Sequence, residues 1–457
     1  MATGEHSDNL AARRVGLLFL GRKRPGFDPD WGAEIRKRLR AYAGAAPFEV
    51  TIPSDNIADD AGLRAALAEC EAAGVDTVVV TQPTISDGRL APVLAQVWNR
   101  PLVFWATPEK QEGAMISANS LVGTHVMAAT LRHLNRPFEF VYGDPANSAV
   151  RDRLEEAVRL TIAATDLRRG KATLVGYHAP GFVDFHADPI DLNDELGIQL
   201  YHESVQEFLG RVENQDDDAV AAEVAAFESL GLPYRDADES VLPLQARYYL
   251  AMQEYLTVEG SSALAFRDWP DLPTVMKQWP YLALARHVSE GKAIAMEGDV
   301  DGALCSLLAE DLGLGPVYLS DWLEHSANHI SIWHTGAAPF QFCEPVGTEL
   351  GPHIGVQFNN RLPAVVEATI KADIPITIFR MWRTDGFYRM TALEGRTVTP
   401  KRHIMATNGL AEVTEVNVNE WFEDMLHEGM PHHVCVVQGH HRRVLQKLAR
   451  QLQIGWQ

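Results

Sequence analysis

Cysteine and long apolar runs are both scarce in this chain of 457 residues. The four cysteines are scattered without a CxxC pair, a pattern typical of reduced thiols rather than of a disulfide framework. Apolar stretches such as 101–106 fall far short of the roughly 20 residues that a membrane helix needs. The opening residues, MATGEHSDNLAARR, contain no apolar core of the kind that marks a secretory signal. We therefore expect a soluble, cytoplasmic protein with no membrane partner.

Positive charge is also in short supply. Lys and Arg number 40 against 61 Asp and Glu, which gives a formal net charge of −21. A chain this acidic repels phosphate backbones at long range, so we expect no nucleic-acid partner. Most of these acids are expected on solvated helix faces, and acidity alone therefore does not indicate a cation site. Hydrophobic residues at 46% and charged residues at 22% are ordinary values for globular domains.

Three common catalytic and nucleotide-binding signatures are absent. No GxGxxG follows the first apolar run, and neither GxxxxGK[ST] nor GxSxG occurs. The sequence thus gives no support for dinucleotide binding, triphosphate binding or an α/β-hydrolase nucleophile. Sugar, phosphosugar and metal chemistry remain open.

The order of apolar runs and amphipathic stretches predicts three domains. Strand-like runs at 14–21, 48–52, 75–81 and 101–106 alternate with helical stretches, which indicates an open parallel sheet. The pattern restarts at 171–177, as a second α/β domain would. From about 353, short strands follow with few helices between them until a closing helix at 442–452. We predict an α/β protein with two Rossmann-like open parallel-sheet domains, 1–168 and 169–320, followed by a mostly antiparallel β domain, 321–457.

Candidate chemical groups concentrate between 295 and 339. The segment AMEGDVDGALCSLL delivers Glu297 at a predicted strand-to-helix turn, and two later predicted strands end at Asp321 and His334. A second source of imidazoles is His432 and His433 in MPHH. Two carboxylates with one or two histidines suit Mn²⁺, Mg²⁺, Co²⁺ or Zn²⁺. Each residue alone also has an ordinary structural explanation, so spacing by itself leaves the metal site open.

These motifs, taken in order, resemble a known superfamily. EGDVDGAL is followed by YLSDW, whose acid lies 24 residues after Glu297, then by WHTGAAP, and much later by GMPHHVCVV with GHHRR. This series resembles the L-fucose isomerase and L-arabinose isomerase superfamily, and it is most similar to the shorter fucose isomerase-like sugar isomerases. The resemblance extends over most of the chain, with its specific motifs in roughly the last 170 residues.

The resemblance implies an intramolecular oxidoreductase that interconverts an aldose and a ketose through a cis-enediol. In that family two acids and a histidine hold a divalent metal, usually Mn²⁺, and the acids also move the proton. Carried over, the two acids are Glu297 and Asp321, and the histidine is His433. His334 matches an additional ligand of the arabinose branch, and His432 is the alternative if the register shifts by one. Mg²⁺ or Co²⁺ are the other expected cofactors.

The resemblance also implies a closed homo-oligomer, hexameric or otherwise, in which the first domain of a neighbouring copy helps to close the pocket. Candidate substrate contacts in that domain are Gln82, Asn119 and His125. A strand-end turn, a helix cap and a helix-surface histidine are the ordinary explanations of these three residues. Trp98, Trp105 and Trp269 are either sugar-stacking or core aromatics.

Two alternatives stay open on the sequence. A metal-dependent aldolase or epimerase would use the same enediolate chemistry on a related, possibly anionic, sugar. A non-catalytic sugar-binding protein would also contain two α/β domains that flank a cleft. Four cations are candidates to reach an anionic substituent, although exposed surface cations are the ordinary explanation: Arg22, Lys23, Arg380 and Arg383.

Overall fold

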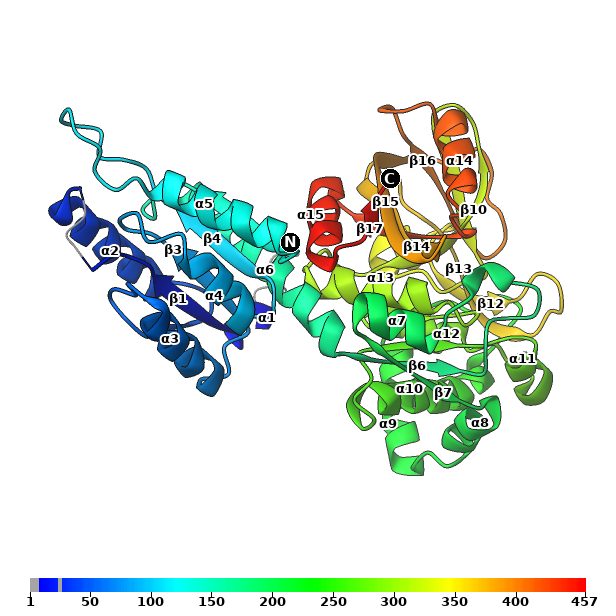
Figure 1. The fold of residues 1–457 in the computed structure, drawn as a ribbon. Helices are drawn as coiled ribbons and strands as arrows, with labels where there is room; N and C mark the ends of the chain where they lie inside the picture. Colours follow the sequence, from blue (N-terminus) through cyan, green and yellow to red (C-terminus); the bar gives the residue numbers. More distant parts are fainter. Residues whose placement is uncertain (1–7, 24–26) are drawn as a thin grey trace. The chain divides into compact units, whose positions relative to one another are not determined.

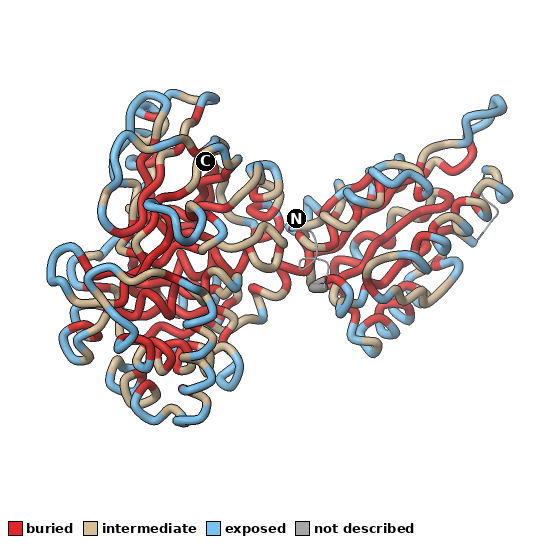
Figure 2. The backbone as a smooth tube through the Cα atoms, turned by 180° about the vertical axis from the view of Figure 1, so that it is seen from behind, coloured by how far each residue is buried: buried red, intermediate tan, exposed pale blue. Residues whose placement is uncertain are grey.

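The computed structural model describes residues 8–23 and 27–457. The chain divides into two compact units, which are described separately. The first unit comprises Met1–Asp166 and Lys447–Gln453, and the second comprises Leu167–Gln446 and Ile454–Gln457. Within each unit the strands and the inner helix faces form a buried interior, drawn red in Figure 2.

The first unit is built on a five-stranded parallel sheet. Its strands are β1 (Arg14–Phe19), β2 (Glu49–Thr51), β3 (Thr77–Thr81), β4 (Leu102–Ala106) and β5 (Phe138–Tyr142), in the order β2-β1-β3-β4-β5. Its helices are α1 (Asp8–Ala11), α2 (Pro29–Ala43), α3 (Asp60–Ala72), α4 (Leu90–Val97), α5 (Ser120–His133) and α6 (Ser148–Arg169). Core side chains of α3, α4 and α5 cover one face, and those of α2 and α6 cover the other. Burial on both faces explains the continuous apolar runs of β3 and β4.

The second unit opens with a four-stranded parallel sheet. Its strands are β6 (Lys171–Val175), β7 (Gln199–Glu203), β8 (Ala263–Phe266) and β9 (Ile294–Ala295), in the order β7-β6-β8-β9. The helices between and after them are α7 (Pro189–Leu196), α8 (Val205–Glu213), α9 (Asp217–Glu228), α10 (Leu242–Thr257), α11 (Asp271–Met276) and α12 (Tyr281–Ser289). A 3₁₀ turn spans Val183–Phe185.

The last part of the second unit is a β barrel. Six strands form a closed antiparallel ring: β10 (Tyr318–His325), β11 (His329–His334), β16 (Thr407–Glu412), β15 (Phe387–Val398), β14 (Pro375–Thr384) and β17 (His433–Gln438). Three short strands extend it, namely β12 (His353–Val356), β13 (Pro363–Thr369) and β18 (Gly455–Trp456). The helices α14 (Val418–His427) and α15 (Arg442–Leu452) complete the chain.

One fully buried helix joins the parallel sheet to the barrel. Helix α13 (Val300–Asp311) contacts β8 and β9 of the parallel sheet and β14 and β17 of the barrel. Figure 1 shows it beside β14 and β17. Every residue from Val300 to Ala309 is buried, which is why most of these positions carry small or apolar side chains. The helix begins directly after the segment 297–299, so it holds that turn between the two sheets.

The structure confirms the predicted fold class of two parallel-sheet α/β parts followed by a mostly antiparallel β part. The domain boundaries at 168 and 320 stay a prediction. The prediction that a strand ends at Asp321 is wrong, because β10 continues to His325. Strands β10 and β11 are antiparallel neighbours in the barrel, so Asp321 and His334 do not lie at ends of successive parallel strands. No described helix is long and apolar enough to cross a membrane.

Candidate active site

Glu297 lies on a tightly constrained turn after β9. Its φ is +61°, an uncommon conformation for a residue other than glycine, and Gly298 follows at +75°. A Cβ at Gly298 would lie 2.3 Å from the carbonyl oxygen of Tyr177, so only glycine fits there. The backbone N–H of Glu297 donates to Asp268 Oδ1 (2.6 Å), and the indole N–H of Trp269 donates to Glu297 Oε1 (3.0 Å). These contacts leave Oε2 of Glu297 facing the cavity.

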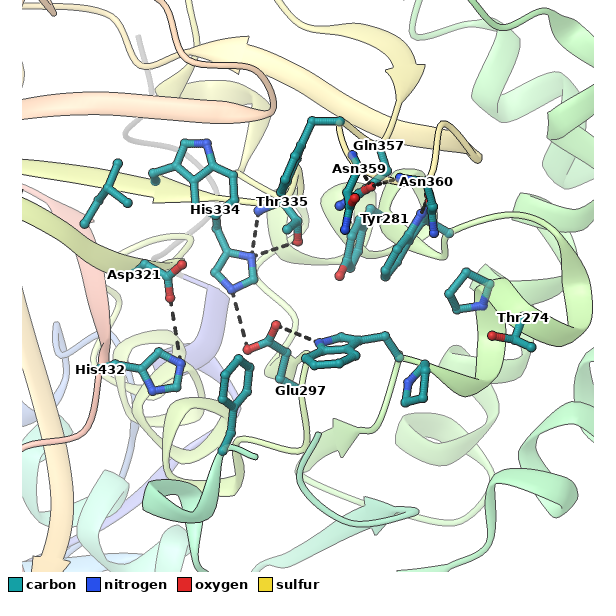
Figure 3. A pocket seen from close by; sticks show the side chains of 18 of the residues that line it. Thr274, Tyr281, Glu297, Asp321, His334, Thr335, Gln357, Asn359, Asn360 and His432 are labelled. Atoms are coloured by element: carbon teal, nitrogen blue, oxygen red, sulfur yellow. Dashed lines mark hydrogen bonds and ion pairs between the residues drawn. The ribbon is translucent and has the colours of Figure 1, made fainter. Parts of the chain in front are cut away.

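Three barrel residues, Asp321, His334 and His433, lie close together beside Glu297, and His433 contacts each of the others. His433 begins β17 and is paired in register with Asp321 on β10, while His334 ends β11. His433 Nε2 lies 3.2 Å from Glu297 Oε2, 3.5 Å from Asp321 Oδ1 and 3.0 Å from His334 Nε2. Figure 3 shows Asp321, His334 and Glu297 directed toward one part of the pocket. The structure therefore brings all four predicted metal ligands together.

A buried ion pair orients His433 from behind. Its Nδ1 lies 3.0 Å from Asp299 Oδ2, and Asp299 accepts two hydrogen bonds of 2.7 Å from the guanidinium of Arg380. Burial would raise the pKa of Asp299, but Arg380 and His433 hold it well below its usual range. An ionised Asp299 fixes the proton of His433 on Nδ1 and turns Nε2 toward Glu297, as partners of metal-binding histidines commonly do.

The field at His433 Nε2 is strongly negative. Burial alone would lower the pKa of His433, but Asp299 and Glu297 raise it to about 10. For Glu297 the two effects act in the opposite sense. Burial would raise the pKa of Glu297, but the neighbouring His433, His334 and Trp269 lower it to about 2. Either a proton or a divalent cation beside His433 Nε2 would be stabilised by this negative potential.

The donor set fits a divalent metal. Two triads of ligand atoms each lie within 4.8 Å: Glu297, His432 and His433, and Asp321, His334 and His433. Four distances among the atoms of Glu297, Asp321, His334 and His433 lie between 3.0 and 4.0 Å, which is the spacing expected of atoms that share one small divalent ion with bonds of about 2.1 Å. Carboxylate oxygens combined with imidazole nitrogens suit Mn²⁺, Co²⁺ or Zn²⁺ better than Ca²⁺.

His432 stands beside this cluster and has a different partner. Its Nδ1 lies 2.6 Å from Asp184 Oδ2, and its ring stacks on Phe185 with centroids 4.5 Å apart. Burial would raise the pKa of Asp184, but the hydrogen bonds from His432 lower it to about 2. The Nε2 atom of His432 is buried, has no hydrogen-bond partner in the described chain, and lies 3.9 Å from Asp321 Oδ1.

A cavity of about 600 Å³ opens onto the cluster. This volume is typical of small-molecule sites. Aromatic rings form much of the wall: Phe182, Trp269, Trp279, Tyr281, Trp322, Trp333 and Phe358. Gln357, Asn359 and Asn360 contribute side-chain amides, and Thr274 and Thr335 contribute hydroxyls. No Lys or Arg of the described chain lines the cavity.

Two kinds of known protein are similar to this chain. Residues 353–457 match the family profile of the L-fucose isomerase C-terminal domain. A sulfoquinovose isomerase of Priestia aryabhattai is 24% identical over 441 residues, which cover 96% of this chain and 98% of that protein. Together these similarities support an L-fucose isomerase-like sugar isomerase family for this chain. The chain is accordingly an isomerase, an intramolecular oxidoreductase.

Two further relatives are also sulfoquinovose isomerases. A sulfoquinovose isomerase of Alkalicoccus urumqiensis is 24% identical over 445 residues, covering 95% of this chain and 97% of its own. Another, from Clostridium sp. (strain MSTE9), is 25% identical over 387 residues, with coverages of 82% and 85%. Among solved structures, an ABC transporter solute-binding protein from Burkholderia multivorans is 13% identical and covers 58% of this chain and 83% of its own. The TM-score between the two structures is 0.18.

The three predicted substrate contacts of the sugar isomerase lie in the first unit. Gln82 is buried after β3, where its Oε1 accepts the N–H of Ser86 (2.8 Å). Asn119 precedes α5 at a φ of +55° without capping it through its side chain, and its N–H donates to Glu109 Oε1 (2.6 Å). His125 is exposed on α5. Their contact with substrate stays a prediction.

Two of the three tryptophans considered for sugar stacking belong to the core, the more ordinary explanation. Trp98 and Trp105 are buried in the interior of the first unit, whereas Trp269 lines the cavity.

Two of the cations considered for an anionic substituent, Arg380 and Arg383, are engaged by acids elsewhere in the second unit. Arg380 is 1% exposed and is occupied by Asp299, while Arg383 pairs with Glu195 (2.6 Å). Neither lines the cavity. In the first unit, Lys23 pairs with Asp59 (2.8 Å), and Arg22 lies over the ring of Phe27.

Several site residues went unnoticed in the sequence. Asp268 follows the end of β8 by two residues, so the rule that ligands gather at the carboxyl ends of parallel strands would have singled it out. Asp184 and the amide group at 357–360 carry no comparable signal. They lie in a 3₁₀ turn and in a loop whose positions depend on the tertiary fold.

Proposed function

We propose that this chain is a divalent-metal-dependent aldose–ketose isomerase whose substrate is a sulfoquinovose-type sugar, a hexose with a sulfonate group. The convergence of Glu297, Asp321, His433 and His334 at one end of an aromatic-lined cavity carries the proposal. The near-full-length similarity to proteins named sulfoquinovose isomerase supports the substrate.

The cavity-facing atoms assigned as metal ligands are Glu297 Oε2, one oxygen of Asp321, His433 Nε2 and His334 Nε2. Mn²⁺, with Mg²⁺ or Co²⁺ as alternatives, would supply Lewis-acid stabilisation of the negative charge that develops on the enediolate. Trp269 holds the other oxygen of Glu297 and so favours binding through Oε2 alone. Burial lowers the pKa of His334 despite the nearby Asp321 and Glu297, which keeps this imidazole neutral and able to bind.

The reaction moves a proton between C2 and C1 of the sugar, and carboxylates are suitable bases for that transfer. We assign the transfer to Glu297 and Asp321. The side chain of Asp321 is 26% exposed against 8% for Glu297, so Asp321 is the more accessible from the cavity. Asp184 orients His432 through Nδ1, which leaves Nε2 beside Asp321 to take up or return a hydroxyl proton.

We further propose that the first unit contributes substrate contacts. Gln82, Asn119 and His125 would contact substrate when copies of the chain assemble into a hexamer or another closed homo-oligomer in the cytoplasm. The family resemblance supports this assignment. Substitution of Asn119 and His125 by alanine, followed by measurement of kcat/KM and of the oligomer size, tests it.

The decisive experiment is elemental analysis of the purified protein together with turnover of a sugar panel before and after chelation. The panel contains sulfoquinovose, quinovose, L-fucose and L-arabinose. We expect near-stoichiometric divalent metal and chelator-sensitive aldose–ketose interconversion, fastest on sulfoquinovose. Carbon–carbon cleavage or epimerisation in place of isomerisation would favour the aldolase or epimerase alternative. A folded protein without metal or turnover would instead favour a sugar-binding protein.

A further inference from the structure

The cavity lacks a cationic side chain that could bind the sulfonate of the proposed substrate, among the described residues. A sulfonate is fully ionised at neutral pH, yet no Lys or Arg of the described chain lines the cavity. Neutral hydrogen-bond donors are the other protein groups that satisfy acceptor-only oxygens. The question is therefore which neutral donors of the cavity are free.

Most of the ring N–H and O–H donors are already occupied. The indole N–H of Trp269 donates to Glu297, that of Trp279 to Asn360 Oδ1 (3.1 Å), and that of Trp333 to the carbonyl of Met405 (2.7 Å). The indole of Trp322 donates to His325, and the hydroxyl of Tyr281 donates to Asp268. The aromatic wall therefore offers faces to a sugar but few free donors.

The amide of Gln357 is locked in one orientation. Its Oε1 accepts the backbone N–H groups of both Asn359 (2.7 Å) and Asn360 (2.8 Å). Two donors occupy the two lone pairs of that oxygen, so the amide cannot flip without losing both hydrogen bonds. The NH₂ end of Gln357 is consequently the end left free.

Asn360 is fixed in the same way. Its Oδ1 accepts the indole N–H of Trp279 and the backbone N–H of Leu362, each at 3.1 Å. Its NH₂ group has no hydrogen-bond partner in residues 8–23 and 27–457, and the same holds for the side chain of Asn359. The loop after β12 thus carries three amides, of which two are built to present donors only.

The amides also lie at a suitable place. Figure 3 shows Gln357, Asn359 and Asn360 as one group and Asp321, Glu297 and His432 as another group in the same pocket. The isomerised carbons C1 and C2 belong at the carboxylate group, so the C6 substituent of a hexose belongs at the far end of the cavity.

We propose that Gln357, Asn359 and Asn360 form a neutral cradle that binds the sulfonate of the substrate. This inference rests on the proposed function, because it names the part of the same cavity that selects an anionic sugar. A site built of fixed donors rejects a ligand that cannot accept them, which makes the cradle a source of specificity.

The test compares three sugars that differ only at C6: sulfoquinovose, the uncharged quinovose, and the cationic 6-amino-6-deoxy-D-glucose. The variants are Asn360→Asp, Gln357→Glu and Asn359→Asp. In the first two, the retained oxygen still accepts its structural hydrogen bonds, and the new carboxylate oxygen replaces the NH₂ group. The side chain of Asn359 makes no hydrogen bond in the described chain, so its substitution leaves the loop contacts in place. Asn419→Asp, exposed at the start of α14, adds the same charge outside the cavity as the matched control.

We expect the ratio of kcat/KM for sulfoquinovose to that for quinovose to fall at least ~30-fold in the cradle variants, because like charges then face each other. The ratio for the amino sugar to quinovose should rise at least ~5-fold, a gain that simple damage to the loop would not produce. The Asn419→Asp control should leave both ratios as they are.

Retention of the sulfoquinovose-to-quinovose ratio within ~3-fold in all three variants would overturn the cradle and leave the isomerase assignment intact. An unsubstituted enzyme that isomerises quinovose faster than sulfoquinovose would overturn the sulfonate substrate itself. Absence of chelator-sensitive turnover on any sugar would overturn the proposed function, and the cradle with it.

Discussion

The carboxyl edges of the two parallel sheets carry similar types of polar residue, but the partners of these side chains differ. In the first unit, the Glu109 carboxylate accepts the backbone N–H groups of Ser117 (2.5 Å), Ala118 (3.0 Å) and Asn119 (2.6 Å). Gln82 likewise accepts a local backbone N–H. In the second unit, Glu297 instead meets side chains from three other segments of that unit, at residues 269, 334 and 433.

The difference arises from what faces each edge. In the second unit the barrel strands β10, β11 and β17 supply the groups that meet Glu297. Among the described residues of the first unit there is no second sheet to face the first one, and the polar groups at its edge therefore satisfy local backbone. A polar residue at a strand end becomes chemically useful here only where a second element brings charge to it.

The largest expected effect comes from removing the acids at the second edge. Glu297→Gln and Asp321→Asn should each lower kcat by about 10³-fold or more, because the amides neither accept a proton nor bind a metal as strongly. Circular dichroism and thermal unfolding should show an intact fold. A near-normal rate in either acid variant would refute its assignment.

The buried pair behind the cluster should govern stability. Asp299→Ala leaves the guanidinium of Arg380, which is 1% exposed, without its partner. Breaking a buried ion pair from one side typically costs about 3–5 kcal/mol. Chemical denaturation should therefore show a loss of that size in the second unit. The double variant Asp299→Ala with Arg380→Met should recover part of it, and a double variant no more stable than the single one would contradict this account.

The paired histidines allow a comparison one residue apart. His433→Ala removes the imidazole whose Nε2 faces Glu297, Asp321 and His334, whereas His432→Ala removes the one held by Asp184. We expect His433→Ala to weaken Mn²⁺ binding about 100-fold, and His432→Ala to weaken it less than ~5-fold. Titration calorimetry of metal-free protein measures both. The reverse order would transfer the ligand role to His432.

Sequence motifs were sufficient for the four residues that converge. Glu297, Asp321, His334 and His433 each stand in a short recognisable motif, and the alternation of strands and helices predicted both parallel sheets. The wrong strand end at Asp321 has a simple cause, since an apolar run shows that a strand exists but not where its exposed half ends. Residues 322–325 of β10 are polar or partly exposed and carry no strand signal.

The supporting residues were beyond reach for a different reason. Arg380 meets Asp299 across 81 positions of sequence, and Asp268 meets Glu297 across 29. Such pairs depend on how α13 packs between the sheets. Arg380 in particular has the sequence appearance of a surface cation, and only its burial between β14 and α13 shows that it serves Asp299.

The smallest expected effect is on the pH dependence of stability. It concerns Asp301, the third acid after β9, following Glu297 and Asp299. Asp301 is buried, receives the hydroxyl of Tyr388 (3.0 Å), and burial raises its pKa to about 7. The folded state therefore retains a proton that the unfolded chain releases above pH ~4, so stability falls as pH rises from about 4 to 7. Asp301→Asn keeps the accepting oxygen and removes this titration. At pH 8 the variant should be more stable than the parent by on the order of 2 kcal/mol, with little difference at pH 4.

Glu109→Gln in the first unit is the comparison variant for that measurement, because the pKa of Glu109 is shifted in the opposite direction to that of Asp301. Burial would raise the pKa of Glu109, but the N–H and hydroxyl donors of Ser117 and the following residues lower it. Its carboxylate therefore stabilises the fold above the ordinary glutamate pKa, and this stability is lost as pH falls through the lowered value. Thermal unfolding between pH 4 and 8 should thus show the Asp301→Asn variant gaining on the parent as pH rises and the Glu109→Gln variant losing to it. Parallel pH profiles for the two variants would mean that the two edges do not treat their carboxyl groups differently.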